Sequence, residues 1–262
     1  MEVLTLDWLA QLLSKPATFR NRTNTGNSGT GGGVIIGTTS VAMLVTLIAA
    51  RDATLRRIGP VGVSGLQCLT VYVADQTHST FFKACRLAGF DPTNLCAIPT
   101  VAENNYELDL ARLFEAMQAD AGVGLVPTYV RATVGTTSTN DVNPVGTVAN
   151  VAALFTHGST STPPMTVVPA YAQSSATTSM ASSAWTPLAN KADGAMTEED
   201  AYEANRVLMK NLIKTGKAYI AHTVVRNRIV LRFAMGPSLQ DQKHVKSAWE
   251  LIKSTTNKMM ME

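Results

Sequence analysis

Hydroxyl residues that follow a glycine-rich stretch are the first feature of the sequence with the chemistry of a binding site. Gly31–Gly33 leads through Val34–Gly37 to Thr38, Thr39 and Ser40. A helical apolar pattern comes next, and we predict Ser40 as the N-cap of that helix. Because a helix start attracts phosphate, Thr39 and Ser40 are predicted phosphate ligands. The alternative is an ordinary turn and cap, and the glycine and lysine spacing excludes a Walker loop and a dinucleotide fingerprint.

Two further polar clusters follow predicted strands. The apolar segment Cys68–Ala74 has the composition of a buried strand, and His78 lies in the polar run after it. A second predicted strand, Val126–Val134, ends in a Gly-Thr-Thr turn that contains Thr137. Ligands of parallel sheets bind at the carboxyl ends of strands, so we expect both clusters at one edge. The alternatives are an ordinary hydrogen-bonded histidine and threonines that only shape a turn.

Strands alternate with helices over the first 155 residues. Apolar spacing predicts helices over 3–14, around Leu44–Leu55, up to Leu87, over Leu110–Met117 and over Val145–Ala152, and strands over 68–74, 95–98 and 126–134. This alternation predicts an α/β fold with a mainly parallel sheet whose faces are covered by helices.

The alternation stops at residue 156. Residues 156–194 are rich in Ser, Thr, Pro and Ala and are predicted to be a linker. Residues 195–262 have the pattern of a small α+β domain. It consists of a helix opened by a capping box and running through Leu212, strands over 218–225 and 229–235, and a last helix.

The bulk composition excludes several classes of protein. The chain has 262 residues, 45% of them hydrophobic, and a net charge of +3 from scattered basic residues, which argues against a nucleic-acid partner. No apolar run reaches the roughly 20 residues that cross a bilayer. The three cysteines have no metal-ligand spacing, so no metal site is expected. Few cysteines suit a reducing compartment, and we expect the protein in the cytoplasm.

Four segments, taken in order, resemble one known family. They are GGGVIIGTTSVAM at 31–43, DQTHSTFFKACRLAGFDP at 75–92, ATVGTTSTNDVNPVG at 132–146, and GKAYIAHTVV with LRFA near the end. Together they resemble the group II pyridoxal-phosphate-dependent decarboxylases of aromatic L-amino acids, and most closely the plant tyrosine and tryptophan decarboxylases. The resemblance implies the aspartate-aminotransferase fold, fold type I. Residues 1–155 would be a partial cofactor-binding large domain, and 195–262 a small C-terminal domain.

The resemblance also implies roles for single residues. Thr39 and Ser40 match the positions that hold the phosphate of pyridoxal 5'-phosphate. His78 matches the histidine that stacks on the pyridine ring and helps catalysis, and Thr137 matches a hydroxyl residue at the cofactor. The family reaction converts an aromatic L-amino acid to an amine and carbon dioxide, here with tyrosine and tryptophan both open as substrates. Such sites lie near a homodimer interface.

Departures from the family pattern concern the reactive end of the cofactor. We find no V-D-A-A-Y-A-G run, whose Asp pairs with the pyridinium nitrogen, and no P-H-K-W motif with its Schiff-base lysine. Lys191 lies in Ala-Asn-Lys-Ala, which matches neither. Val41 stands where the family has an acidic residue, and Arg131 where a small or apolar residue is typical. The chain also begins inside the family domain, so we expect a decarboxylase that lacks its start and centre.

This pattern leaves three hypotheses open. The chain is an inactive or impaired decarboxylase, or a truncated paralogue that forms a heterodimer with an intact decarboxylase subunit, or an incomplete gene model. Sequencing of the transcript across codons 150–200 separates the third from the others.

Overall fold

The computed structural model divides by its contacts into two compact units, Met1–Ala42 and Met43–Glu262. It describes residues 1–12, 20–21, 31–59, 62–136, 138–139, 141–155, 166–171, 198–225, 228–232 and 241–261. This division differs from the predicted domains 1–155 and 195–262, which stay a prediction.

The first unit contains helix α1 (Glu2–Leu12). The carboxylate of Asp7 is buried and accepts hydrogen bonds from the backbone N–H and the side-chain amide of Asn21, at 2.7 and 3.3 Å. Glu2 accepts a bond of 2.6 Å from the backbone N–H of Ile35. These bonds tie Asn21 and Ile35 to a short helix, which packing alone would hold weakly.

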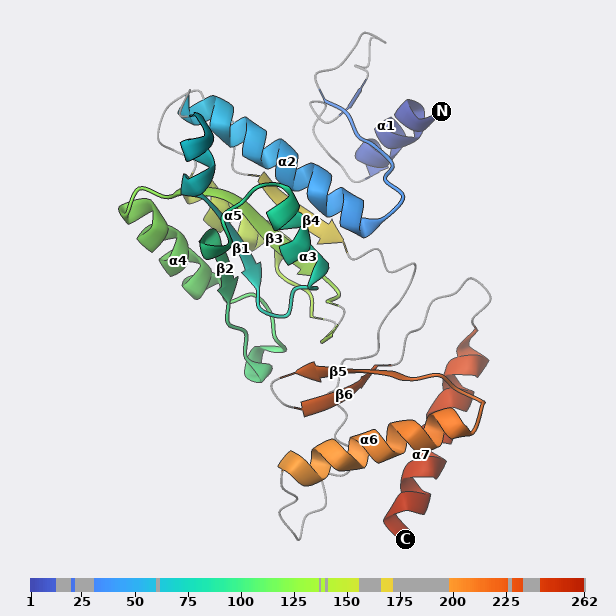
Figure 1. Ribbon diagram of the computed structural model, residues 1–262. Helices are drawn as coiled ribbons and strands as arrows, with labels where there is room; N and C mark the ends of the chain where they lie inside the picture. Colours follow the sequence, from blue (N-terminus) through green and yellow to red (C-terminus); the bar gives the residue numbers. More distant parts are fainter. Residues whose placement is uncertain are drawn as a thin grey trace. The chain divides into compact units, whose positions relative to one another are not determined.

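A four-stranded parallel sheet forms the centre of the second unit (Figure 1). Its strands are β1 (Leu69–Ala74), β2 (Leu95–Ile98), β3 (Val126–Val134) and β4 (Thr166–Tyr171), in the order β2-β1-β3-β4. The predicted parallel sheet is confirmed, and the bounds of β2 and β3 are those expected. Cys68 closes a 3-10 helix before β1, so that strand begins one residue later than predicted.

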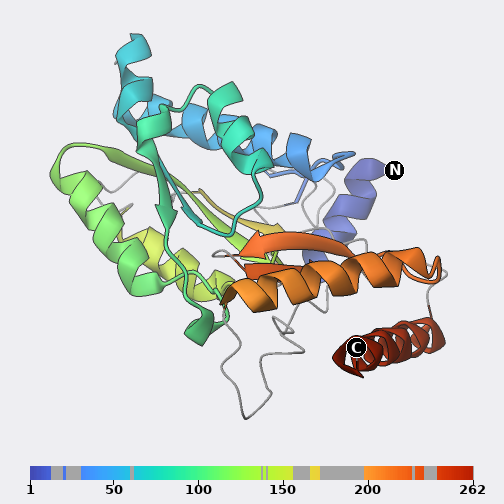
Figure 2. The same cartoon turned by 60° about the horizontal axis from the view of Figure 1, so that its bottom comes forward.

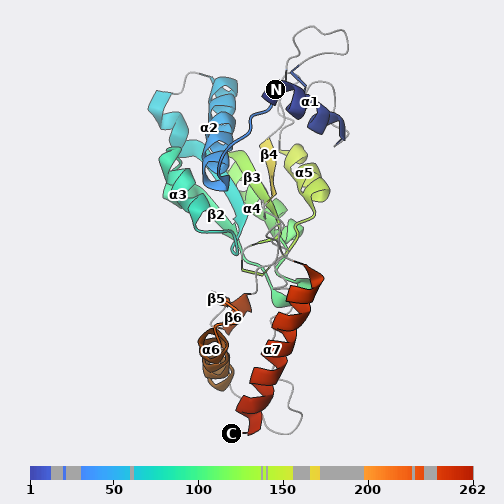
Figure 3. The same cartoon turned by 90° about the vertical axis from the view of Figure 1, so that its right-hand side faces the viewer.

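Helices cover both faces of this sheet (Figure 3). Helices α2 (Thr39–Ile58) and α3 (Thr80–Leu87) pack on one face, and α4 (Leu110–Gly122) and α5 (Val145–Leu154) on the other. All six residues of β1 are buried, as expected of a strand covered on both sides. Short 3-10 helices complete the connections at Gly62–Cys68, Pro92–Asn94 and Ala102–Asn104.

Strand β4 was not expected. Its residues 166–171 lie within the segment 156–194 predicted as a linker, and they pair with β3 from Tyr129 to Val134. The strand was missed because it is short, contains Pro169 and is flanked by residues typical of loops. The remaining residues of that segment lie outside the described part of the chain.

The C-terminal region forms a helix, a hairpin and a second helix, as predicted. Helix α6 (Glu198–Lys214) runs beside the antiparallel hairpin of β5 (Ala221–Val225) and β6 (Arg228–Arg232) (Figure 2). Helix α7 (Gln242–Met261) packs against α6. The amide of Asn205 on α6 donates 3.1 Å to the carbonyl of Ile229 on β6, which fixes the helix to the hairpin.

Candidate functional site

The helix start at Thr39 differs from the prediction in its cap. Helix α2 begins at Thr39, and the hydroxyl of Thr38 accepts a bond of 3.3 Å from the backbone N–H of Val41. Thr38 is therefore the cap, and the prediction of Ser40 as N-cap is wrong. The first N–H groups of a helix have no partner within it, so those of Thr39 and Ser40 suit a phosphate. Their role as phosphate ligands stays a prediction.

The loop after β1 places His78 at the start of α3. Asp75 anchors this loop, because its backbone N–H bonds to the carbonyl of Ile98 and its carboxylate accepts 2.6 Å from the hydroxyl of Thr100. The His78 side chain is exposed, and its Nδ1 accepts 3.2 Å from the backbone N–H of Thr80. A neutral imidazole whose Nδ1 accepts carries its proton on Nε2. His78 can thus present an N–H donor to a ligand.

The loop after β3 is organised by a buried carboxylate. Asp141 is 4% exposed and accepts bonds from the hydroxyls of Thr136 and Thr139 and from the amide of Asn143. Burial raises the pKa of Asp141 from its ordinary value, although these bonds act against the rise. Thr136 is buried in this network, and Thr137 lies outside the described residues, so its predicted contact with the cofactor stays a prediction.

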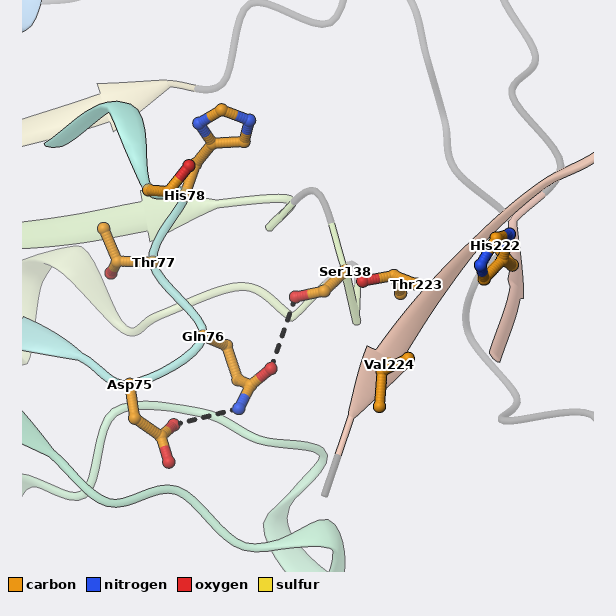
Figure 4. A pocket seen from close by; sticks show the side chains of 9 residues that line it. Asp75, Gln76, Thr77, His78, Ser138, His222, Thr223 and Val224 are labelled. Atoms are coloured by element: carbon orange, nitrogen blue, oxygen red, sulfur yellow. Dashed lines mark hydrogen bonds between the residues drawn. The ribbon is translucent and has the colours of Figure 1, made fainter. Parts of the chain in front are cut away.

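These two loops meet at a pocket of about 360 Å³ (Figure 4). The hydroxyl of Ser138 donates 3.4 Å to the amide oxygen of Gln76, and the amide nitrogen of Gln76 donates 3.3 Å to Asp75. The expectation that both polar clusters lie at one sheet edge is confirmed. The full lining is Asp75, Gln76, Thr77, His78, Ser79, Ser138, His222, Thr223 and Val224.

Of the nine residues that line this pocket, His78 was predicted as a site residue and the other eight were not. Gln76 and Ser138 are immediate neighbours in sequence of the polar clusters, and that proximity is the signal that could have found them. His222 comes from β5, where a histidine in a hairpin has no local pattern that marks it as part of a pocket. Among the described residues, no group of three His, Cys, Asp or Glu side chains could hold a metal ion.

Strand β3 also carries a buried cation. Arg131 on β3 is 3% exposed, and its guanidinium carbon lies 5.1 Å from the centre of the Phe81 ring. Its Nε donates a long bond of 3.4 Å to the hydroxyl of Thr133. In the part of the chain that the structure describes, its Nη1 has no hydrogen-bond partner. Burial lowers the pKa of Arg131, because desolvation penalises the charged form.

Comparison with known proteins identifies the family. Residues 1–171 match the model of the pyridoxal-dependent decarboxylase conserved domain. The chain belongs to the pyridoxal-dependent decarboxylase family. The family cofactor is pyridoxal phosphate, which agrees with the prediction, and the α/β fold is that of fold type I. No helix among the described residues has the length and apolar character of a membrane span.

Plant decarboxylases are among the similar proteins. Tryptophan decarboxylase 1 of Oryza sativa subsp. japonica is 45% identical, and the alignment covers 99% of this chain and 73% of that protein. A crystal structure of Oryza sativa TDC with PLP and tryptamine superposes with a TM-score of 0.79 at 45% identity, covering 99% of this chain and 75% of that one. Tryptophan decarboxylase TDC2 of Camptotheca acuminata is 47% identical over 60% of this chain and 30% of its own length.

The alignment with the rice protein shows a gap inside the chain. It extends over 377 residues, 115 more than the 262 of this chain, so at least 115 aligned positions have no counterpart here. The family match ends at Tyr171, within Val167–Gln173, which has the sequence VVPAYAQ. This segment keeps four residues of the V-D-A-A-Y-A-G run, and Val168 takes the place of Asp. The V-D-A-A-Y-A-G run itself does not occur in the sequence, and this similar segment has no carboxylate at its second position.

The residues of each unit can be compared separately with the chemical groups of the cofactor. The open helix start at Thr39 and Ser40 suits a phosphate group. In the second unit, Val168 pairs in the sheet with Arg131, which is a buried cation and a hydrogen-bond donor. A protonated pyridine ring needs an acceptor with negative charge. The donor set therefore suits the cofactor phosphate and does not suit a protonated ring.

Proposed function

We propose that this chain is a catalytically deficient aromatic L-amino-acid decarboxylase that keeps part of its cofactor site. The reaction of the intact relatives would release the α-carboxylate of tyrosine or tryptophan as carbon dioxide and leave the amine. Pyridoxal phosphate, when bound, supplies an electron-withdrawing ring for such chemistry. The proposal rests on the segment VVPAYAQ at 167–173, which has Val168 where the similar family run has Asp, and on the pairing of Val168 with the buried Arg131.

The residues that the chain retains support binding more than turnover. Thr39 and Ser40 would hold the cofactor phosphate with first-turn N–H groups and hydroxyls. The Nε2–H of His78 would lie against the ring or donate to the substrate. The P-H-K-W motif does not occur in the sequence, so the lysine that assists substrate exchange and product release in the family has no counterpart. We therefore expect weak, non-covalent binding of pyridoxal phosphate.

Amine formation tests the proposal. The purified chain is incubated with pyridoxal phosphate and tyrosine or tryptophan, and tyramine and tryptamine are quantified by mass spectrometry. The rice tryptophan decarboxylase under the same conditions is the control. Loss of a positioned acid–base group alone costs roughly 100-fold or more, so we expect a rate at least that far below the control. A rate equal to that of the rice enzyme would refute the proposed deficiency.

A second candidate function is association with an intact decarboxylase subunit. Helix α1 exposes large apolar side chains, including Trp8 at 66% and Leu12 at 80%. Apolar side chains gathered on one short helix favour a protein partner. The sparse cysteines favour a cytoplasmic location, where such a partner would be found.

Co-expression with the rice enzyme, each chain carrying a different tag, tests this second function. We expect the two chains to elute together in size exclusion, and the double variant Trp8→Ser/Leu12→Ser to separate them. Separate elution of the unmodified chains at all concentrations would exclude the association.

A further inference from the structure

Arg131 has the features of a ligand-binding group rather than of a core residue. A buried charge is costly unless it is paired and hydrogen-bonded. Arg131 is 3% exposed, and its Nη1 has no partner in the described part of the chain. A ring face and one long bond to Thr133 are all that the described surroundings supply. Such an arrangement calls for an acceptor that a ligand brings.

The neighbouring side chains do not supply that acceptor. The Tyr129 hydroxyl is engaged with the hydroxyl of Thr46 at 3.2 Å. The Cys85 thiol is fully buried and neutral, because burial raises its pKa to about 12. Among the described residues, no carboxylate forms an ion pair with Arg131. The guanidinium therefore keeps an unused donor inside the sheet.

The position of Arg131 indicates which acceptor it meets. Its partner across the parallel ladder is Val168 of β4, which stands in VVPAYAQ where the similar family run has Asp. Its guanidinium lies over Phe81, three residues after His78. Arg131 is thus adjacent to the backbone position at which the family pattern has the Asp that pairs with the ring nitrogen. Its guanidinium has the opposite charge to that carboxylate, and it donates hydrogen bonds where the carboxylate accepts them.

We propose that Arg131 replaces the carboxylate as the partner of the ring nitrogen, and that the site selects a pyridine ring that is neutral and accepts a hydrogen bond. This inference rests on the proposed cofactor site. A guanidinium repels a protonated ring nitrogen and donates to an unprotonated one. The ring then withdraws electrons less strongly, which agrees with a site that binds and turns over poorly.

Two ligands that differ only at the ring nitrogen test the inference by binding alone. Pyridoxal phosphate and its N-methyl derivative, a permanent cation, are titrated into the full-length wild-type chain by equilibrium dialysis at pH 8. Both carry the same phosphate, so the phosphate contribution cancels in the ratio of dissociation constants. The N-methyl derivative cannot accept the hydrogen bond from Arg131, and the guanidinium repels its positive charge. We therefore expect its dissociation constant to be roughly tenfold or more above that of pyridoxal phosphate.

Two variants sharpen the test. Arg131→Met keeps the side-chain length and removes the donors, so the preference should fall to nearly onefold. Arg131→Val combined with Val168→Asp restores the family arrangement and should reverse the preference toward the N-methyl compound. Thermal melting of each variant identifies any that do not fold. The ratio of dissociation constants measured for the wild-type chain tests the inference even if a variant does not fold.

The outcomes separate this inference from the proposed function. Equal binding of both compounds to the wild type, or tighter binding of the N-methyl compound, overturns the role of Arg131 and leaves cofactor binding intact. Absence of binding of either compound overturns both.

Discussion

Replacement of Arg131 by methionine should stabilise the chain. The change removes the stacking on Phe81, worth about 0.5–2 kcal/mol, and the long bond to Thr133, worth at most about 1 kcal/mol. It also removes the desolvation penalty of a cation that is 3% exposed and has an unpartnered Nη1. Exchange of a buried charge for an apolar side chain of similar volume is often stabilising by about 1–4 kcal/mol. We expect a net gain of about 1–3 kcal/mol.

Urea denaturation followed by circular dichroism measures this gain. For a chain of this size it corresponds to a rise in the melting midpoint of roughly 2–10 °C. The matched control is Arg112→Met on α4, where the side chain is 50% exposed and pairs with Asp109. That control should change stability by less than about 0.5 kcal/mol. A loss of more than about 1 kcal/mol in Arg131→Met would show that the buried guanidinium is fully satisfied, and would refute the reasoning.

Three further predictions concern buried polar groups. Because burial raises the pKa of Asp141, the folded chain binds the proton of this carboxyl group more tightly than the unfolded chain does. The contribution of Asp141 to the free energy of unfolding therefore falls as the pH rises above about 4. Urea midpoints measured across pH should show this decline in the wild type and not in Asp141→Asn. The same dependence of the midpoint on pH in both proteins would contradict the prediction. Tyr72→Phe removes the bond of 2.6 Å to Asp120 and should cost about 1 kcal/mol in urea unfolding, whereas a neutral result would mean that water replaces it. Iodoacetamide at pH 8 should leave Cys85 unmodified in the native chain and modify it in urea, and native labelling seen by peptide mapping would contradict its burial.

Strands β1, β2 and β3 could be predicted because each carries its own signal in the sequence. The apolar runs at 95–98 and 126–134 are bounded by turn residues, and the structure keeps both sets of bounds. The helix cap was predicted two residues too late, because Thr38 and Ser40 both carry hydroxyls and only the backbone path decides which one reaches a free N–H. The local composition therefore cannot distinguish Thr38 from Ser40 as the N-cap.

The pairing of the buried cation Arg131 on β3 with Val168 on β4 could not be predicted in full. The sequence marks Arg131 as a departure from the family, but its burial and its register with Val168 depend on the pairing of strands 37 residues apart. Strand β4 itself was hidden by a composition typical of loops. The same limit applies to His222, which joins the pocket only through the tertiary fold.

We propose that this decarboxylase relative lacks the covalent attachment of its cofactor. Borohydride reduction in the presence of pyridoxal phosphate, followed by peptide mapping, tests it most directly, with the rice enzyme as positive control. We expect that no single lysine of this chain is modified stoichiometrically, while the control carries one reduced adduct. A stoichiometric adduct on one lysine, Lys191 for example, would contradict the proposed absence of a covalent bond and identify an active-site lysine outside the family motif.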